Sequence, residues 1–202
     1  MAKRILNMTA EEMTHATKNE LIEAIAGSEG RVLASETIGI TIPLLTDVTN
    51  AEFAASMGAD LILLNMFDVQ EPKIMALPEV EKEETVREVK RLTGRMVGIN
   101  LEPVEESYAS DNKETLWEMS AGRYATVENA IQAQKMGVDL IVLTGNPGNG
   151  VSNPAIISSL KAISEAVGEK IMLAAGKMHA SGIIGEGGEN IITKEDIRQF
   201  AE

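Results

Sequence analysis

The sequence contains no cysteine and few aromatic residues. The lack of cysteine excludes disulfides, a thiolate nucleophile and a cysteine-based zinc site, and it fits a reducing compartment. Aromatic residues make up 3% of the 202 residues, so aliphatic side chains and eleven methionines must fill the interior. Methionine packs well into irregular gaps, and we expect it to serve as core material here.

Long apolar runs and positive charge are also scarce. The longest apolar run, Leu61 to Phe67, is far shorter than the ~20 residues that span a bilayer, and the basic start of the chain lacks the apolar stretch of a secretory signal. The chain has 18 Lys and Arg against 31 Asp and Glu, a net charge of −13. Such a surface repels nucleic acid. We therefore expect a cytoplasmic protein that binds neither membranes nor nucleic acid.

Five short apolar runs recur along the chain, with starts roughly 30 to 45 residues apart, the size of a strand–helix unit. Because they are apolar on both faces, these runs are typical of strands buried in a parallel sheet. They are Arg31–Ser35, Leu61–Met66, Met96–Leu101, Leu140–Thr144 and Ile171–Ala175.

The segments around these runs carry helix start and stop signals. Glycine is expected to end four helices, at Gly58, Gly94, Gly137 and Gly168. Asn153 and Pro154 are expected to start the fourth of these helices, and a capping box at Thr193 to open the last helix of the chain. The expected helices are one or two within Thr9–Ala26 that close the floor of the sheet, then Ala51–Met57, Glu79–Leu92, Thr126–Met136, Asn153–Val167 and the segment after Thr193.

An internal repeat supports this reading. The first repeat (Val48–Asn65) aligns without gaps on the second repeat (Val127–Thr144), and ten of the eighteen positions are identical. Each contains a helix, a stopping glycine, an aspartate and a buried strand, which is one supersecondary unit used twice. Because Asp60 and Asp139 lie at strand starts, we expect both to have structural roles.

These patterns predict an α/β fold of the (βα)8 TIM-barrel type in one domain, 1–202. Residues 1–30 would form N-terminal helices and residues 31–202 about five βα units. A complete barrel takes ~250 residues, so we expect the barrel to be incomplete at the C-terminus. Its open edges should then pair in a homo-oligomer, be disordered, or be completed by residues absent from this chain.

Polar residues follow the predicted strands, where parallel α/β folds bind ligands. Glu36 and Asp68, with Glu102 as a third carboxylate, are candidates for holding Mg²⁺ or Mn²⁺, because hard cations prefer oxygen ligands. Glu102 and His179 are candidates for moving protons. Lys177 would pair with an anionic substrate or form a Schiff base, and a plain surface role is the alternative.

The loop Thr144–Asn153 is rich in glycine and precedes a helix start. Its backbone N–H groups and the helix N-terminus are typical of a phosphate or carboxylate cradle, and a loop without a ligand is the alternative. It lacks the Gly-Lys-Ser/Thr ending of a Walker loop. The expected binding residues are Asn65, Asn100, Thr144, Gly145, Asn146, Gly148 and Gly150.

Several motifs resemble one bacterial TIM-barrel family, across essentially the whole chain. They are Ser35-Glu-Thr-Ile38, Thr46 to Glu52, Met57 to Asp68, Gly98-Ile-Asn-Leu-Glu-Pro-Val104 and Leu143 to Gly148. Members of that family are labelled phosphoenolpyruvate phosphonomutase-like or haloacid dehalogenase-like. The sequence has no Asp-x-Asp pair, which rejects the dehalogenase name, and it also lacks the Asp-Lys-x-x-x-Lys-x-Asn loop of the mutases.

The resemblance implies a barrel enzyme of the mutase-like kind, with lyase or isomerase chemistry. Its partner would be a small anionic metabolite, phosphorylated or carboxylated, bound where the strands end. The alternative is a non-catalytic metabolite-binding or assembly protein built from the same barrel units.

Overall fold

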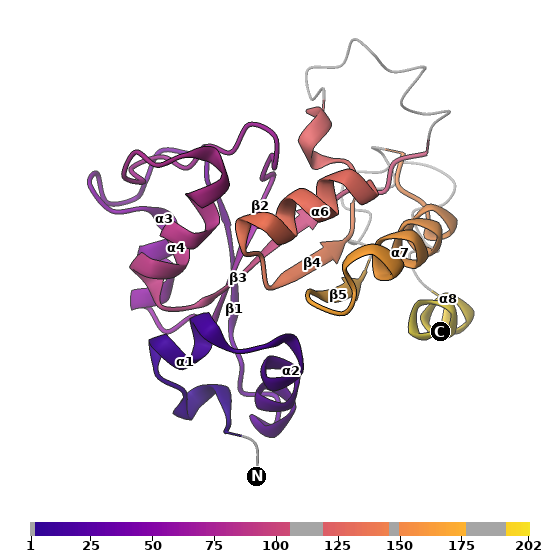
Figure 1. The fold of residues 1–202 in the computed structure, drawn as a ribbon, viewed down its shortest axis with the longest axis horizontal. Helices are drawn as coiled ribbons and strands as arrows, with labels where there is room; N and C mark the ends of the chain where they lie inside the picture. Colours follow the sequence, from indigo (N-terminus) through magenta and orange to yellow (C-terminus); the bar gives the residue numbers. More distant parts are fainter. Residues whose placement is uncertain (1–2, 106–118, 146–149, 177–192) are drawn as a thin grey trace.

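The computed structural model of the chain describes residues 3–105, 119–145, 150–176 and 193–202. At its centre is a parallel sheet with strand order β1-β2-β3-β4-β5 (Figure 1). This confirms the predicted α/β fold with five parallel strands in sequential order. The strands are β1 (Ala34–Ile38), β2 (Leu61–Asn65), β3 (Met96–Leu101), β4 (Leu140–Leu143) and β5 (Met172–Ala175).

Helices precede the sheet and alternate with its strands. They are α1 (Ala10–His15), α2 (Lys18–Gly27), α3 (Asn50–Ser56), α4 (Thr85–Thr93), α6 (Val127–Met136), α7 (Asn153–Val167) and α8 (Lys194–Ala201), with short 3₁₀ turns at Ile5–Asn7, Lys82–Glu84 and Ala121–Arg123. Within the described part of the chain, no helix is long and apolar enough to cross a membrane.

The predicted stop and start signals act as expected at three helix ends. Gly94 and Gly137 follow α4 and α6 in the left-handed conformation, with φ of 63° and 87°. Thr193 and Asp196 form the capping box of α8, in which each side chain bonds the backbone N–H of the other. These signals are local, so the sequence was sufficient to place them.

Helix α7 begins at Asn153 as predicted, but its N-cap is Ser152 and not Asn153, because the Ser152 hydroxyl accepts the N–H of Ala155. One helix start differs from the prediction. Helix α4 begins at Thr85 and not at Glu79, because the backbone up to Glu81 stays extended and the next turn is 3₁₀.

The first strand also begins later than the predicted run Arg31–Ser35. The N–H of Leu33 donates to the Asp60 carboxylate at 2.9 Å, and pairing with β2 starts at Ala34. Glu36 therefore lies within β1 and not after it.

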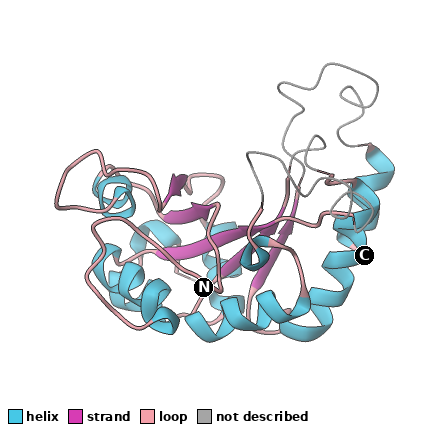
Figure 2. Ribbon diagram, turned by 90° about the horizontal axis from the view of Figure 1, so that it is seen from above, coloured by secondary structure: helices cyan, strands magenta, loops and turns pink. Residues whose placement is uncertain are grey.

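One face of the sheet is covered by helices, and strands β2, β3 and β4 present only apolar side chains to it. At the β1 edge of this face, Ser35 and Thr37 pair with Ile62 and Leu64 and add polar side chains. Helices α3, α4, α6 and α7 follow one another around this helix-covered face in an arc (Figure 2). The residues of β2, β3 and β4 that point to it are 0–1% exposed and form the main core: Ile62, Leu64, Val97, Ile99, Leu101, Ile141 and Leu143. Burial of this kind stabilises the fold by roughly 25 cal/mol per Å² of apolar surface.

The opposite face, here called the open face, is built from the alternate strand residues. At the strand starts, Leu61, Met96 and Met172 pack against α1 and α2 in a second apolar cluster. Helices α1 and α2 thus close the floor, as predicted (Figure 1). Higher up, Leu63 and Val142 are only half-buried, and polar residues follow at the strand ends.

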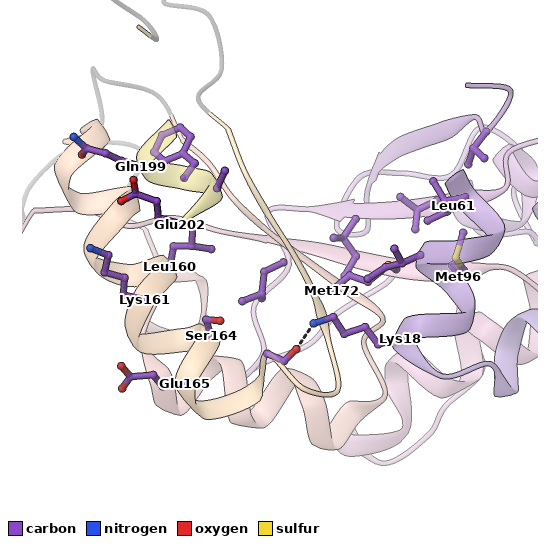
Figure 3. A pocket seen from close by; sticks show the side chains of 18 residues that line it. Lys18, Leu61, Met96, Leu160, Lys161, Ser164, Glu165, Met172, Gln199 and Glu202 are labelled. Atoms are coloured by element: carbon purple, nitrogen blue, oxygen red, sulfur yellow. Dashed lines mark hydrogen bonds between the residues drawn. The ribbon is translucent and has the colours of Figure 1, made fainter. Parts of the chain in front are cut away.

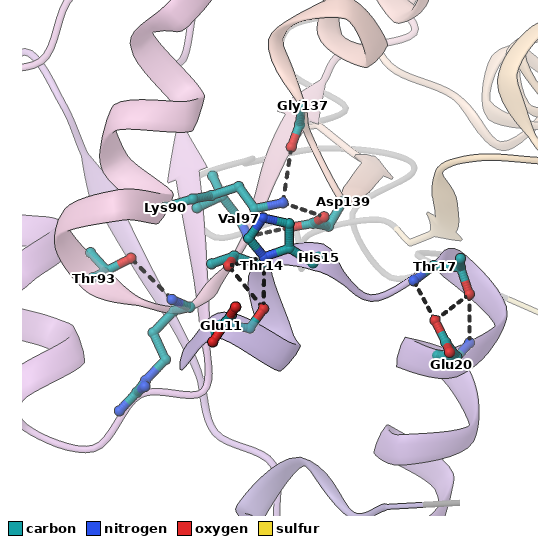
Figure 4. A network of polar contacts seen from close by, with 11 residues as sticks. Glu11, Thr14, His15, Thr17, Glu20, Lys90, Thr93, Val97, Gly137 and Asp139 are labelled. Atoms are coloured by element: carbon teal, nitrogen blue, oxygen red, sulfur yellow. Dashed lines mark hydrogen bonds and ion pairs between the residues drawn. The ribbon is translucent and has the colours of Figure 1, made fainter. Parts of the chain in front are cut away.

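The two repeat aspartates hold neighbouring strands together. Asp139 accepts the N–H of Val97 at 2.9 Å and pairs with the Lys90 ammonium at 2.7 Å (Figure 4). The Asp60 carboxylate likewise accepts the backbone N–H of Leu33. Burial raises the pKa of Asp139, and the Lys90 charge and the Val97 N–H oppose that rise without cancelling it. Both contacts confirm the structural role that the sequence predicted.

Candidate functional site

Side chains from three neighbouring strands meet at the carboxyl end of the open face. The Asn100 side-chain nitrogen Nδ2 donates to Glu36 Oε1 at 2.8 Å and to Asn65 Oδ1 at 3.2 Å. Asn65 Oδ1 also accepts the N–H of Met66 at 2.8 Å, and Met66 has a left-handed backbone with φ of 56°. Strain of this kind costs about 1–3 kcal/mol and is concentrated at functional sites. We call Glu36, Asn65 and Asn100 the strand-end cluster.

The orientation of the Asn100 amide is fixed by its neighbours. Asn65 must present its oxygen because that atom accepts a backbone N–H, and an ionised Glu36 carboxylate only accepts. Asn100 therefore turns its nitrogen to both of them, and its own oxygen Oδ1 points elsewhere. Asn100 is 6% exposed, and this oxygen has no hydrogen-bond partner among the described residues. A buried acceptor of this kind calls for a ligand, an ion or a water.

Glu102 lies two residues after Asn100, directly after β3, and its side chain pairs with an arginine. Its Oε1 accepts from the Arg123 guanidinium, and its backbone N–H donates to the Arg123 carbonyl at 2.9 Å. Both side chains are mostly buried, and Arg123 Nε has no partner among the described residues. Sequence reasoning missed Arg123. The available signal was an isolated cation, in an acidic chain, just before the helix start at Thr126.

Asp68 is engaged in a turn and does not contact the strand-end cluster through any described hydrogen bond. Its Oδ1 accepts the N–H groups of Gln70 at 2.7 Å and Glu71 at 2.9 Å. Burial acts to raise the pKa of Asp68, but hydrogen bonds from Ser120, Glu71 and Gln70 and the charge of Arg123 outweigh it and lower the pKa. No group of three or more His, Asp or Glu side chains in the described ranges is arranged to hold a metal.

The described part of the glycine loop is closely packed at both ends. Thr144 is buried, and its N–H donates to Leu101 O at 3.2 Å. At Gly145 a Cβ atom would lie 2.5 Å from Val151, so only glycine fits. Gly150 has φ of 79°, which favours glycine. Four predicted site residues, Asn146, Gly148, Lys177 and His179, lie outside the described residues.

The N-terminus of α7 already meets a carboxylate of the same chain. The Ser152 hydroxyl, which caps the helix, donates to Glu105 Oε1. An internal carboxylate at this position competes with a phosphate for the same positive helix end. The anion cradle remains a prediction.

Carboxylates outnumber cations where the strands end. Glu36, Asp68, Glu102 and Glu105 lie after or within neighbouring strands, and Arg123 is the described cation that contacts this group. An anionic ligand there needs further positive charge, from a metal ion or from a cation outside the described residues.

A cavity lies at the other end of the sheet. It measures about 820 Å³ and lies between α2, the strand starts, α7 and α8 (Figure 3). Leu61, Met96 and Met172 form its apolar wall, and Lys18 at its edge donates to the carbonyl of Gly168. No predicted site residue lines it, so the cavity is separate from the strand-end cluster.

Solved structures with a similar fold include two barrel proteins. One is 2,3-dimethylmalate lyase, a member of the PEP mutase/isocitrate lyase superfamily, with a TM-score of 0.54 and 11% identity over 96% of this chain and 60% of that one. Another is a phosphonomutase candidate from Burkholderia cenocepacia J2315, with a TM-score of 0.51 and 16% identity over 85% of this chain and 65% of that one. These likenesses show the fold and agree with the barrel type expected from the sequence.

This chain spans less than two thirds of the length of either structure. A comparison with curated proteins gave no match, and nothing in the comparisons points to a haloacid dehalogenase. A protein-family model matches residues 6–202, nearly the whole chain. The chain therefore belongs to the family described as Domain of unknown function (DUF7916).

Proposed function

We propose that the protein is a lyase- or isomerase-type enzyme that acts on a small carboxylated or phosphorylated metabolite at the carboxyl ends of its strands. The observation that carries the proposal is the strand-end cluster, in which the buried Oδ1 of Asn100 is left without a partner. A buried unpaired polar atom costs about 1–3 kcal/mol, and a ligand that donates to it recovers that cost. The fold shared with 2,3-dimethylmalate lyase supports the choice of chemistry.

The proposal includes a divalent cation that Glu36 and Asn100 would help to hold, although the described residues contain no acidic group of three arranged for a metal. Glu36 supplies a carboxylate and Asn100 an orphaned amide oxygen, which are the ligand types that Mg²⁺ and Mn²⁺ prefer, with water filling the other positions. The excess of carboxylates around the site also favours a cation, because a positive ion is attracted by their negative charge. When bound, the ion would neutralise negative charge that develops on substrate oxygens. Asp68 stays a predicted ligand, although its carboxylate is engaged in a turn.

Proton transfer in this proposal falls to Glu102, Lys177 or His179. Arg123 holds Oε1 of Glu102, so the other oxygen, Oε2, would face the substrate. That oxygen lies toward Gly145, where a Cβ atom would be 3.5 Å away. Lys177 would pair with the substrate anion.

A second candidate is a metabolite-binding protein without catalysis. It is favoured by the state of two carboxylates: Asp68 and Glu102 are both taken up by contacts that hold the chain together. In that case the cluster would bind a ligand and no bond would be broken.

Calorimetry and a product assay test the proposal. The chain is titrated with 2-oxo acids, hydroxy acids and sugar phosphates, with Mg²⁺ and with a chelator, beside Asn100→Ala and the control Asn19→Ala. Asn19 is exposed on α2 at the floor. We expect Asn100→Ala to lose at least about tenfold in affinity, as loss of a buried hydrogen bond does, and Asn19→Ala to bind normally.

Turnover is followed by nuclear magnetic resonance of the best ligand. Appearance of a cleaved or isomerised product supports the enzyme. Tight binding without product supports the second candidate, and equal binding by Asn100→Ala would place the ligand elsewhere and refute the site.

A further inference from the structure

The loop that joins β1 to α3, residues 39–48, holds large apolar side chains in solvent. Ile40 is 53% exposed, Ile42 85%, Leu44 71% and Leu45 48%. Soluble monomers rarely gather exposed apolar side chains in one place, and such patches mark interaction sites. We call residues 39–48 the apolar loop.

The apolar loop is held open by hydrogen bonds and close contacts. Asn50 Oδ1 accepts the N–H of Leu44 at 2.9 Å, and its Nδ2 donates to Thr41 Oγ1 at 3.3 Å. At the loop start, the Gly39 carbonyl accepts the N–H of Met75 at 2.8 Å. These hydrogen bonds fix the backbone at both ends of the loop. The loop conformation therefore keeps the apolar side chains on the surface.

The apolar loop continues an open strand edge. Among the described strands, β1 pairs with β2 alone, so the backbone groups on its outer side are open to another strand. Leu33, just before β1, is 54% exposed. Glu36 is the charged residue of β1, and its carboxylate contacts Asn100 on the open face. The edge and the apolar loop form one strip.

Charge points to a second copy as the occupant of this strip. The chain carries a net charge of −13, so two copies repel each other over most of their surfaces. The ten residues from Thr37 to Thr46 carry no charge at all. A strongly basic partner would gain most from the acidic surface and least from this strip. A like-charged copy meets the least repulsion here.

We propose that the apolar loop and the outer edge of β1 form a symmetric interface between two copies of this chain. Strand β1 would run antiparallel to its copy across a two-fold axis, as the symmetry requires. A stable interface buries roughly 800 Å² on each partner. Since four side chains are a small part of that area, the β1 edge and Leu33 take part as well. This inference does not depend on the proposed function.

Sedimentation of the 202-residue chain over a range of concentrations tests the interface. Leu44→Asp is compared with Met57→Asp, because both side chains are 71% exposed and Met57 lies at the far end of α3. The expected result is a dimer whose mass does not grow with concentration. We expect Leu44→Asp to weaken it at least about tenfold, the effect of losing one buried anchor, and Met57→Asp to leave it unchanged.

The absence of cysteine gives an independent measurement. Ile42→Cys adds a single thiol in the apolar loop, and a short bismaleimide should link two copies, whereas Met57→Cys should stay unlinked. This test keeps its meaning if Leu44→Asp fails to fold. A wild-type monomer at every concentration, a Leu44→Asp dimer of full strength, or growth beyond the dimer would each overturn the proposal.

Discussion

The two repeats use the same residues for the same backbone tasks. Gly58 and Gly137 end their helices in left-handed conformations, with φ of 99° and 87°. Two residues after each glycine, an aspartate accepts a backbone N–H from the neighbouring strand segment. Asp60 accepts from Leu33, just before β1, and Asp139 accepts from Val97 in β3. Residues shared by the two repeats therefore take the same backbone roles.

The surroundings of the two repeats differ sharply. Met136 in the second repeat is 0% exposed, whereas its counterpart Met57 is 71% exposed. Asn129 is 3% exposed, and its side chain makes hydrogen bonds to three other residues. The Asn50 side chain instead accepts the N–H of Leu44 in the exposed loop after β1. The first repeat ends in β2, which has only β1 outside it, while the second ends in β4 between β3 and β5. Burial, and with it stability, comes from the neighbours.

The largest contrast is expected at the repeat aspartates. Asp139→Ala leaves Lys90, whose side chain is 11% exposed, as an unpaired buried charge, and should cost about 3–5 kcal/mol of unfolding free energy. Asp60 has no ion pair among the described residues, so Asp60→Ala should cost about 1 kcal/mol. Urea unfolding measures both.

A second substitution checks the cause. Lys90→Met added to Asp139→Ala should recover most of the loss, because it removes the unpaired charge. If the double variant is no more stable than Asp139→Ala, the Val97 hydrogen bond and not the ion pair carries the energy.

The repeat methionines should show the next largest contrast. Met136→Ala leaves a cavity in the main core and should cost about 2–5 kcal/mol. Met57→Ala removes a mostly exposed side chain, and such substitutions change stability by less than about 0.5 kcal/mol. Calorimetric melting of the two variants decides the point, and equal losses would contradict the assigned difference in burial.

The repeat asparagines test buried hydrogen bonds. Asn129 Nδ2 donates to the carbonyls of Ala121 and Tyr124, and its oxygen accepts from Gln70. Asn129→Ala should cost about 1–3 kcal/mol, because it leaves buried groups unpaired. Asn50→Ala should cost less, since water can replace its contacts. Hydrogen exchange of residues 119–126 should accelerate in Asn129→Ala alone.

The smallest contrast is expected at the repeat glycines. Both have positive φ, so Gly58→Ala and Gly137→Ala should each cost about 1–2 kcal/mol from backbone strain. A new methyl at Gly58 meets nothing within 4 Å, whereas at Gly137 it would lie 3.3 Å from Arg87. The Gly137 variant should therefore be slightly the less stable in urea unfolding. A reversed order would show that Arg87 moves aside without cost.

Sequence reasoning located much of the fold and part of the candidate site. Alternating buried strands and helix caps were readable because they depend on residues close together in the chain. Glu36, Asn65 and Asn100 were found because each belongs to a strand end, and parallel strands bring such ends together. Arg123 was missed, because nothing local marks it as the partner of Glu102, 21 residues earlier.

The sequence alone determined the five strands, their order, the repeated unit and the roles of Asp60 and Asp139. Only the tertiary structure decided which carboxylates are engaged and which stay available. Asp68 is taken up by Ser120 and two backbone N–H groups, whereas Glu36 contacts Asn100, a buried amide whose oxygen has no partner among the described residues. The physical reason is distance along the chain: partners from remote segments set burial and hydrogen bonding, and local patterns carry no record of them.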